Sequence, residues 1–230
     1  MSSGAGSAGS ARVSGAHAQQ AGKGPPQDDD IVPHAGELFR RHPLVAGGSR
    51  PPYTITPVNL KAQDHKKPEF LRINPKGKVP ALVTERGDVL TEFPAICYWL
   101  ANMAPAERKL WPDTLIEQTH TLSTLDLIVA TLHMRGFTLV RVPQRFHSDP
   151  GAQEALSAFG RSEVTAGLDV LDRILGEQDY LAGNFGIADC AAFYCLAWAE
   201  PTGIALSPRL AAYLHRLRAR PAAQRIRASA

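Results

Sequence analysis

The sequence predicts an α/β domain followed by an all-helical domain, and the order of its local patterns is the evidence. Segments with strand character lie between residues 53 and 90 of the 230-residue chain. From about residue 92 onward the apolar residues recur at helical spacing. A mixed segment followed by helices alone is typical of an α/β domain joined to a helical bundle. The chain is long enough for two small domains, each with its own core.

The predicted strands are short. Residues 53–58 alternate aromatic or aliphatic residues with threonine, and their proline favours an edge strand. Residues 79–83 form an apolar strand, residues 85–88 a turn, and residues 89–90 the returning partner. Between the first two strands, residues 66–73 predict one or two helical turns.

Helix signals dominate the rest of the chain. Thr91-Glu92-Phe93-Pro94 predicts a helix start, because proline favours the first turn of a helix. The further predicted helices are residues 114–142, interrupted or bent at Gly136, residues 152–176, residues 189–198, residues 207–219 and residues 221–228. Residues 189–198 are apolar all round, which predicts a buried central helix.

Composition excludes several classes of protein. A net charge of +3, with no dense basic run, does not favour nucleic-acid binding. Three cysteines without a C-x-x-C pair favour neither a disulfide framework nor a zinc or dithiol site, so we expect them to be buried. No stretch has membrane-spanning length and no secretory leader is recognised, so the expected location is cytoplasmic.

The expected domain boundaries follow from these patterns. Residues 1–30 are dominated by Gly, Ala and Ser and are expected to be a disordered low-complexity tail, although a mis-assigned start is an alternative. Residues 31–107 are assigned to the α/β domain and residues 113–230 to the helical domain.

Four segments carry motifs that belong together. They are Asn74-Pro75-Lys76-Gly77-Lys78-Val79-Pro80-Ala81-Leu82, Leu90-Thr91-Glu92-Phe93-Pro94-Ala95-Ile96, Tyr180-Leu181-Ala182-Gly183-Asn184-Phe185-Gly186-Ile187-Ala188-Asp189, and Arg220-Pro221-Ala222-Ala223-Gln224. Together they resemble the cytosolic glutathione transferases, nearest to the bacterial beta class. The resemblance covers roughly residues 52–228. It implies a thioredoxin-like N-terminal domain, with or without its first strand, and glutathione as co-substrate.

The resemblance also implies a binding site. Pro80 would follow a cis peptide bond, and the backbone of Val79 would pair with glutathione as with an added strand. Glu92 would face the ammonium group of the γ-glutamyl end, while the helix start behind it holds the neighbouring carboxylate. The alternative is that Glu92 only complements the helix dipole. Lys78 matches a position that helps to hold the glycyl carboxylate, or is a solvated turn lysine.

Four further residues are implied, and Phe93 among them departs from the family pattern. Phe93 stands where relatives have a hydroxyl residue, so the carboxylate would rely on backbone N–H groups, and a lost hydrogen bond to a charged group would weaken binding by ~1.5–3 kcal/mol. His133 resembles a histidine that points toward the glutathione sulfur, and Asp126, seven residues earlier, would share its helix face. The alternative for His133 is a packed core residue. Asp189 is expected to support the helix start at Gly186.

The usual catalytic group is missing. The family activates the thiol with Tyr, Ser or Cys just after the first strand, which corresponds to residues 34–40, and this segment contains none of them. Either the chain is a relative that has lost this group, or residues 1–50 are translated from the wrong frame or start.

Three functional hypotheses follow. The first is an enzyme that conjugates glutathione to small hydrophobic electrophiles or uses glutathione for a related reaction. The second is a catalytically degenerate glutathione transferase-like binding or scaffold protein. The third is a glutathione-dependent lyase or reductase of the same fold. Family resemblance also implies a homodimer built through residues 114–142 and 92–104, without nucleic-acid or membrane partners. Fold alone does not decide between these hypotheses.

Overall fold

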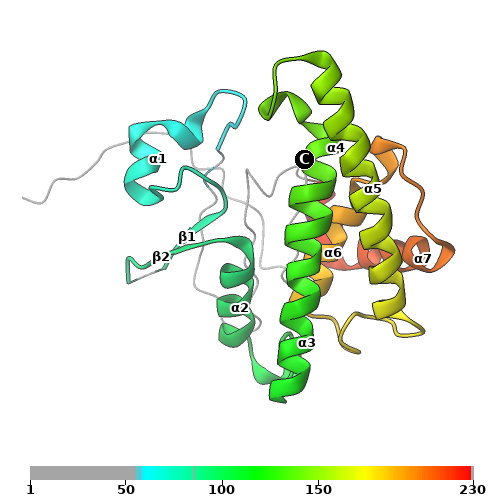
Figure 1. Cartoon of the computed structure of the whole chain (residues 1–230). Coiled ribbons are helices and arrows are strands. Elements are labelled where there is room, and N and C mark those ends of the chain that lie inside the picture. The colour runs from blue at the N-terminus through cyan, green and yellow to red at the C-terminus, as the bar shows by residue number, and fades with distance from the viewer. Residues whose placement is uncertain (1–55, 57, 85, 229–230) are drawn as a thin grey trace, which may run out of the picture.

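The structure is a computed structural model that describes residues 56, 58–84 and 86–228. The predicted tail, the segment 34–40 and most of the predicted strand at 53–58 lie outside the described residues. Figure 1 shows two strands and helices α1 and α2 on one side of the molecule, and the longer helices on the other. This arrangement confirms an N-terminal part with a small sheet followed by a helical part.

The N-terminal part holds a two-stranded antiparallel sheet. Strand β1 (Ala81–Val83) pairs with β2 (Val89–Thr91), with Leu82 opposite Leu90. The single turn η1 (Asp64–Lys66) and helix α1 (Pro68–Ile73) precede the sheet. The strand pair and the helix at 66–73 therefore lie where the sequence predicts them, although β1 begins two residues later than expected.

Helix α2 (Phe93–Met103) begins directly after the sheet. Its N-cap residue is Glu92, Pro94 occupies the first turn, and the helix ends where the Ala104 N–H meets the Leu100 carbonyl. The buried face of α2 includes Ile96 and Leu100, which pack into the shared core, so the predicted helical spacing sets the buried face.

Among the described residues, the helical part contains one long continuous rod and four further helices longer than a single turn. These are α3 (Leu115–Asp126), the π-helix η3 (Leu127–Phe137) and α4 (Thr138–Arg141), which run on from one another, and α5 (Pro150–Leu175), α6 (Ile187–Ala197), α7 (Pro208–Ala219) and α8 (Pro221–Ala228). Single turns occur at η2 (Ala106–Arg108), η4 (Pro143–Arg145) and η5 (Glu200–Thr202). These bounds match the predicted helices to within a few residues.

The predicted interruption of the 114–142 helix takes the form of the π-helix η3. Gly136 lies near its end, where it permits a close approach to α5: a Cβ at Gly136 would meet Val164 Cγ2 at 2.6 Å, and one at Gly160 would meet the Gly136 carbonyl oxygen at 2.8 Å. Absence of side chains at these two positions therefore lets the two helices pack backbone against backbone.

Helix α6 is the centre of the core. Every residue from Ile187 to Leu196 is buried, which confirms the predicted central helix. Cys97, Cys190 and Cys195 are also buried and unbridged, as their apolar surroundings predict. Across the described ranges, no helix is both long and apolar enough to cross a membrane.

Candidate functional site

A tight loop before β1 shapes the candidate site. Asn74 is 1% exposed, and its side chain donates from Nδ2 to the Lys78 carbonyl at 2.6 Å and accepts from the Lys76 N–H at 3.1 Å. Gly77 adopts a φ of +58°, where a side chain would be strained, and a Cβ there would meet Lys66 Nζ at 2.9 Å. Asn74 and Gly77 thus fix the path of the chain into Val79.

The peptide bond between Val79 and Pro80 is cis, as the resemblance implies. Pro80 is buried, whereas Val79 is half-buried and precedes the β1–β2 ladder, which starts at Ala81. Within the described ranges, neither the N–H nor the carbonyl of Val79 forms a backbone hydrogen bond. A free donor and acceptor at a strand start can pair with an extended peptide.

Glu92 lies at the start of α2 and directly follows β2 in the chain. Its backbone has a φ of 68°, which is uncommon for a residue other than glycine, and its side chain does not cap the helix. The Glu92 Oε1 atom instead accepts from Lys76 Nζ at 2.8 Å, and the same ammonium donates to Thr91 Oγ1 at 2.9 Å. Within the part of the chain that the structure describes, no side chain caps the first N–H groups of α2, and such groups can bind an anion.

Phe93 does not face a ligand through its side chain. It is 7% exposed, and its ring meets Tyr194 edge to face at a centroid distance of 5.6 Å. Phe93 thus joins α2 to the buried helix α6. Its backbone N–H belongs to the α2 start, which is the only contribution it can offer a carboxylate there.

His133 packs against the same aromatic group. Its Nδ1 atom lies 3.1 Å from the Tyr194 hydroxyl, and its ring centroid lies 5.0 Å from that of Trp198. Burial, and secondarily the positive charge of Arg141, lowers the pKa of His133 from 6.5 to about 4. The imidazole is therefore neutral at neutral pH.

The structure does not bring Asp126 to the face that holds His133. Asp126 is exposed at the end of α3, whereas His133 is partly buried within η3. The reasoning from a seven-residue spacing assumed an α-helix, but the wider i→i+5 turns of η3 change the angle between the two positions. The expectation of a shared helix face is therefore wrong.

Sequence reasoning missed several residues that the structure places at the site. Lys76 reaches Glu92 and Lys66 lies against Gly77, whereas Lys78, the predicted contact, is exposed. The role of the Asn74 side chain in holding this loop was also missed. Its position two residues before Lys76 is typical of a side chain that accepts from the backbone, and this signal was available in the sequence.

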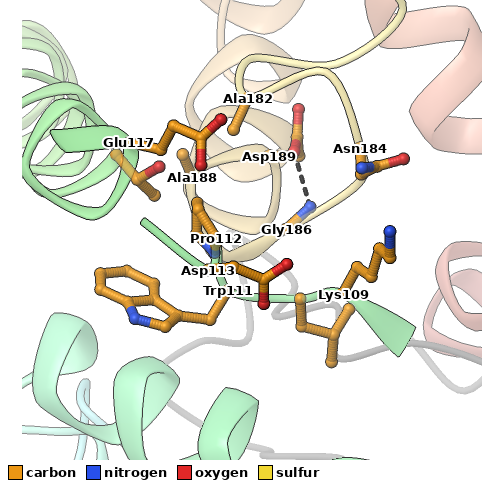
Figure 2. Close-up of a pocket in the computed structure, with 12 residues that line it drawn as sticks. Lys109, Trp111, Pro112, Asp113, Glu117, Ala182, Asn184, Gly186, Ala188 and Asp189 are labelled. Atoms are coloured by element: carbon orange, nitrogen blue, oxygen red, sulfur yellow. Dashed lines mark hydrogen bonds between the residues drawn. The ribbon is translucent and has the colours of Figure 1, made fainter. Parts of the chain in front are cut away.

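A separate cavity lies where the segment before α3 meets the loop before α6. It has a volume of about 200 Å³ and is lined by the segment before α3, the first turns of α3 and the loop before α6. Figure 2 shows Lys109, Trp111, Asp113 and Glu117 around it, with Gly186 and Asp189 behind. None of its lining residues belongs to the Val79 and Glu92 region, so this cavity is not the candidate site.

Asp189 stabilises the loop beside this cavity. Its carboxylate accepts from the N–H groups of Leu181 at 3.0 Å and Gly186 at 2.8 Å and from the Tyr213 hydroxyl. Burial raises the pKa of Asp189 from 3.8 to about 6, and these three donors oppose the rise. The geometry agrees with the structural role expected for Asp189, with glycine as the cap.

Metal-ligand groupings and two of the cysteines bear on whether the described residues offer a metal site or a reactive thiol. No group of three or more His, Cys, Asp or Glu residues is arranged to hold a metal ion among the described residues. Burial raises the pKa of the Cys97 and Cys195 thiols, so neither is a reactive thiolate near neutral pH.

Comparison with known proteins identifies similar chains. Residues 49–103 match the family "Glutathione S-transferase, N-terminal domain", and residues 150–227 match "Glutathione S-transferase, C-terminal domain". The chain is 31% identical to glutathione S-transferase GstA of Escherichia coli O157:H7 over 177 residues, covering 75% of this chain and 84% of that protein. It is 28% identical to maleylacetoacetate isomerase of Pseudomonas aeruginosa over 164 residues, covering 69% and 76%.

Solved structures show the same likeness. A sphingomonad glutathione S-transferase complexed with glutathione superimposes with a TM-score of 0.62 at 31% identity, covering 73% of this chain and 82% of that chain. A glutathione transferase homologue from Sulfitobacter with bound glutathione gives a TM-score of 0.70 at 24% identity, covering 77% and 86%, and supports the fold alone.

Proposed function

This chain belongs to the glutathione S-transferase family, and on that basis we propose that it binds glutathione and conjugates the glutathione thiolate to a small hydrophobic electrophile, so that the thiol loses its proton and a bond forms between sulfur and the electrophile. The observation that carries the proposal is that the backbone of Val79 has no backbone hydrogen-bond partner among the described residues and belongs to the loop that Lys76 ties to the start of α2 at Glu92. Val79 offers one donor and one acceptor to the cysteinyl unit of an extended tripeptide.

The γ-glutamyl end carries an ammonium and a carboxylate on one carbon atom. Glu92 supplies an anion for the ammonium, and the N–H groups at the start of α2 supply donors for the carboxylate. Because Lys76 occupies only Oε1 of Glu92 among the described residues, Oε2 is left for the incoming ammonium. Glu92 and the neighbouring N–H groups of α2 thus bind the two opposite charges of this end.

The glycyl carboxylate is proposed to meet a lysine. Lys78 directly precedes Val79 and is exposed, and Lys66 lies against Gly77 in the same loop. Lys78 belongs to the loop that an extended peptide paired with Val79 would pass, and Lys66 reaches the same loop from the end of η1. Either ammonium group acts as a point charge for a carboxylate.

We propose His133 as the group that faces the thiolate. Burial raises the pKa of Tyr194 well above 10, so its hydroxyl stays protonated and can donate to His133 Nδ1. The proton of the neutral imidazole then lies on Nε2, which is able to donate a hydrogen bond to sulfur. In this arrangement His133 acts as a hydrogen-bond donor rather than as a positive charge.

The proposal is tested by calorimetric titration of glutathione into the purified chain. We expect saturable binding that weakens about tenfold or more in Glu92→Ala, because a hydrogen bond to a charged group contributes ~1.5–3 kcal/mol. Lys67→Met is the matched control, since Lys67 pairs only with Asp64 in the described structure. Equal affinity in Glu92→Ala would show that glutathione does not use this site.

A second candidate function is a non-catalytic binding protein. The burial of Phe93 favours it, since the side chain that follows Glu92 contributes no hydroxyl to the ligand. Turnover of a chromogenic electrophile separates the two: glutathione binding without turnover supports the non-catalytic protein, whereas turnover above the buffer rate supports the transferase.

We also propose that the chain forms a homodimer through α2 and the first turns of α3. Met103, Leu115 and Ile116 expose 60%, 79% and 61% of their surfaces, which is typical of an interface rather than of a monomer's surface. Light scattering should give twice the chain mass, and Leu115→Glu with Ile116→Glu should give the monomer. A monomeric wild type at micromolar concentration would refute this proposal.

A further inference from the structure

A guanidinium group lies at the border of the aromatic cluster that holds His133. The guanidinium carbon of Arg141, the last residue of α4, stands 4.4 Å from the ring centroid of Trp198. Trp198 meets Tyr194 at 5.3 Å, and Tyr194 meets Phe93 at 5.6 Å. A continuous wall of rings thus leads from the start of α2 to Arg141, and Arg141 is exposed where this wall ends.

A second arginine reinforces this charge. Arg145, in the turn η4 that follows α4, acts together with burial, which is the larger cause, to lower the pKa of Arg141. In the described structure neither guanidinium forms a salt bridge with a carboxylate. Other arginines of the helical part do: Arg135 with Glu163, Arg209 with Asp172 and Glu177, Arg216 with Asp179, and Arg218 with Glu200.

The N-terminal part adds cations to the same region. His65 in η1 has a pKa lowered by burial first and then by the charges of Lys66 and Arg145, so Arg145 lies close enough to act across the two parts. Lys66 Nζ in turn lies against Gly77 of the loop before Val79. Positive charge therefore extends from the proposed glutathione loop to Arg141. Figure 1 shows α1 and α4 on the two sides of this region.

Two neighbouring guanidinium groups with no carboxylate partner favour an anionic ligand, because an anion offsets their mutual repulsion. Arginine also presents a planar set of donors that fits a carboxylate in two-point contact. The buried Trp198 Nε1–H is another donor without a partner in the described region. A ligand with carboxylate oxygens would supply acceptors for the two guanidinium groups.

We propose that Arg141 and Arg145 bind a carboxylate carried by the electrophilic substrate, so that the chain prefers acidic electrophiles to neutral ones of the same shape. This inference rests on the proposed glutathione transfer, since the electrophile must reach the sulfur beside Val79 and His133. The glycyl carboxylate of glutathione is the other source of the same chemistry, and Lys66 and Lys78 are the groups assigned to it.

The test uses binding of two conjugates, which needs no turnover. S-hexylglutathione and S-(5-carboxypentyl)glutathione differ only in that a terminal carboxyl replaces a methyl group. Calorimetry on the full chain should show the carboxylated conjugate binding about tenfold tighter, as one charge-assisted contact implies. Arg141→Met, which keeps an apolar contact with Trp198, and Arg145→Met should each remove this preference. Arg141→Lys should retain part of it, and Arg135→Met, whose guanidinium pairs with Glu163, should retain all of it.

Each other outcome overturns the inference in a distinguishable way. Equal binding of the two conjugates by the wild type contradicts it and leaves glutathione binding intact. Weaker binding of both conjugates and of free glutathione in Arg145→Met, without change in the preference, assigns the arginine to the glycyl carboxylate. Failure of all three ligands to bind a chain with a cooperative thermal unfolding transition overturns the proposed function, and the inference with it.

Discussion

Lys76 Nζ lies 2.8 Å from Glu92 Oε1, which ties the loop before Val79 to the start of α2. Both side chains are about half exposed, at 49% and 56%, so the pair contributes only ~0–1 kcal/mol. We therefore expect Lys76→Met to change glutathione affinity by less than about threefold, whereas Glu92→Gln lowers it about tenfold or more. Calorimetry on both variants checks this. A loss in Lys76→Met as large as that in Glu92→Gln would make Lys76, not Glu92, the ligand contact.

Asn74 should be a positioning residue for Val79. Asn74→Ala removes two side-chain hydrogen bonds from a residue that is 1% exposed, so the free energy of unfolding should fall by about 1–3 kcal/mol and glutathione affinity should fall with it. Urea denaturation and calorimetry measure the two effects. Asn102→Ala is the control, because Asn102 is exposed and bonds only to the Tyr98 carbonyl. Unchanged binding in Asn74→Ala would show that this loop does not shape the site.

The contact between η3 and α5 should not accept a methyl group. A Cβ at Gly160 would lie 2.8 Å from the Gly136 carbonyl oxygen and 2.9 Å from Leu139 Cβ, and such overpacking costs about 1–3 kcal/mol. Alanine gains about 1 kcal/mol of helix propensity, so Gly160→Ala should be destabilising on balance. Gly151→Ala in the same helix meets only Asp149 Oδ2, at 3.2 Å, and should be neutral or stabilising. Equal thermal midpoints for the two variants would contradict the close packing.

His133 should make the fold less stable in acid. Its pKa is about 4 in the folded chain and 6.5 ordinarily, so the unfolded chain binds more protons between these values. The contribution of His133 to the free energy of unfolding is fully present above pH 6.5, and it falls by about 3 kcal/mol as the pH drops toward 4. Asp189 acts in the opposite direction between pH 3.8 and 6, so the readout is the difference between wild type and His133→Gln. A difference that stays constant from pH 7 to pH 4 would show that His133 is not buried as described.

Asp189 should be essential for folding rather than for glutathione contact. Asp189→Ala leaves the Leu181 and Gly186 N–H groups and the Tyr213 hydroxyl without an acceptor, at about 1–3 kcal/mol each. We expect a loss of at least about 3 kcal/mol in chemical denaturation. Asp88→Ala, at an exposed turn, should cost under about 0.5 kcal/mol. Equal losses in the two variants would remove the structural role of Asp189.

Most of the features of the fold and site that could be predicted depend on sequence patterns within a few neighbouring residues. The strand pair and the helix start at Glu92 each depend on a few neighbouring residues, and the structure has them at or within two residues of the expected positions. The cis bond at Pro80 was implied by the family resemblance, and the structure has it as well. The buried helix α6 was equally visible, because an apolar run without a polar face can be stable only inside a core.

The remaining features depend on contacts between distant segments. Nothing near Phe93 indicates that its ring meets Tyr194, and nothing near Arg141 indicates that it covers Trp198. The expectation that Asp126 and His133 share a helix face failed because the π-helix between them cannot be recognised from the spacing of apolar residues. Residues 34–40, where the usual Tyr, Ser or Cys is not found, lie outside the described residues. Both explanations for this, a lost catalytic group and a wrong frame or start, therefore stay predictions.

The most direct test of the central claim is a titration of glutathione into the ¹⁵N-labelled chain, followed by amide NMR. The account predicts saturable shifts of the Val79 and Phe93 amide signals with one common affinity, while the Gly186 amide, which donates to Asp189, does not move. Saturable binding that leaves the Val79 and Phe93 signals unchanged would contradict the proposed site, and the absence of any shift in the folded chain would contradict glutathione binding itself.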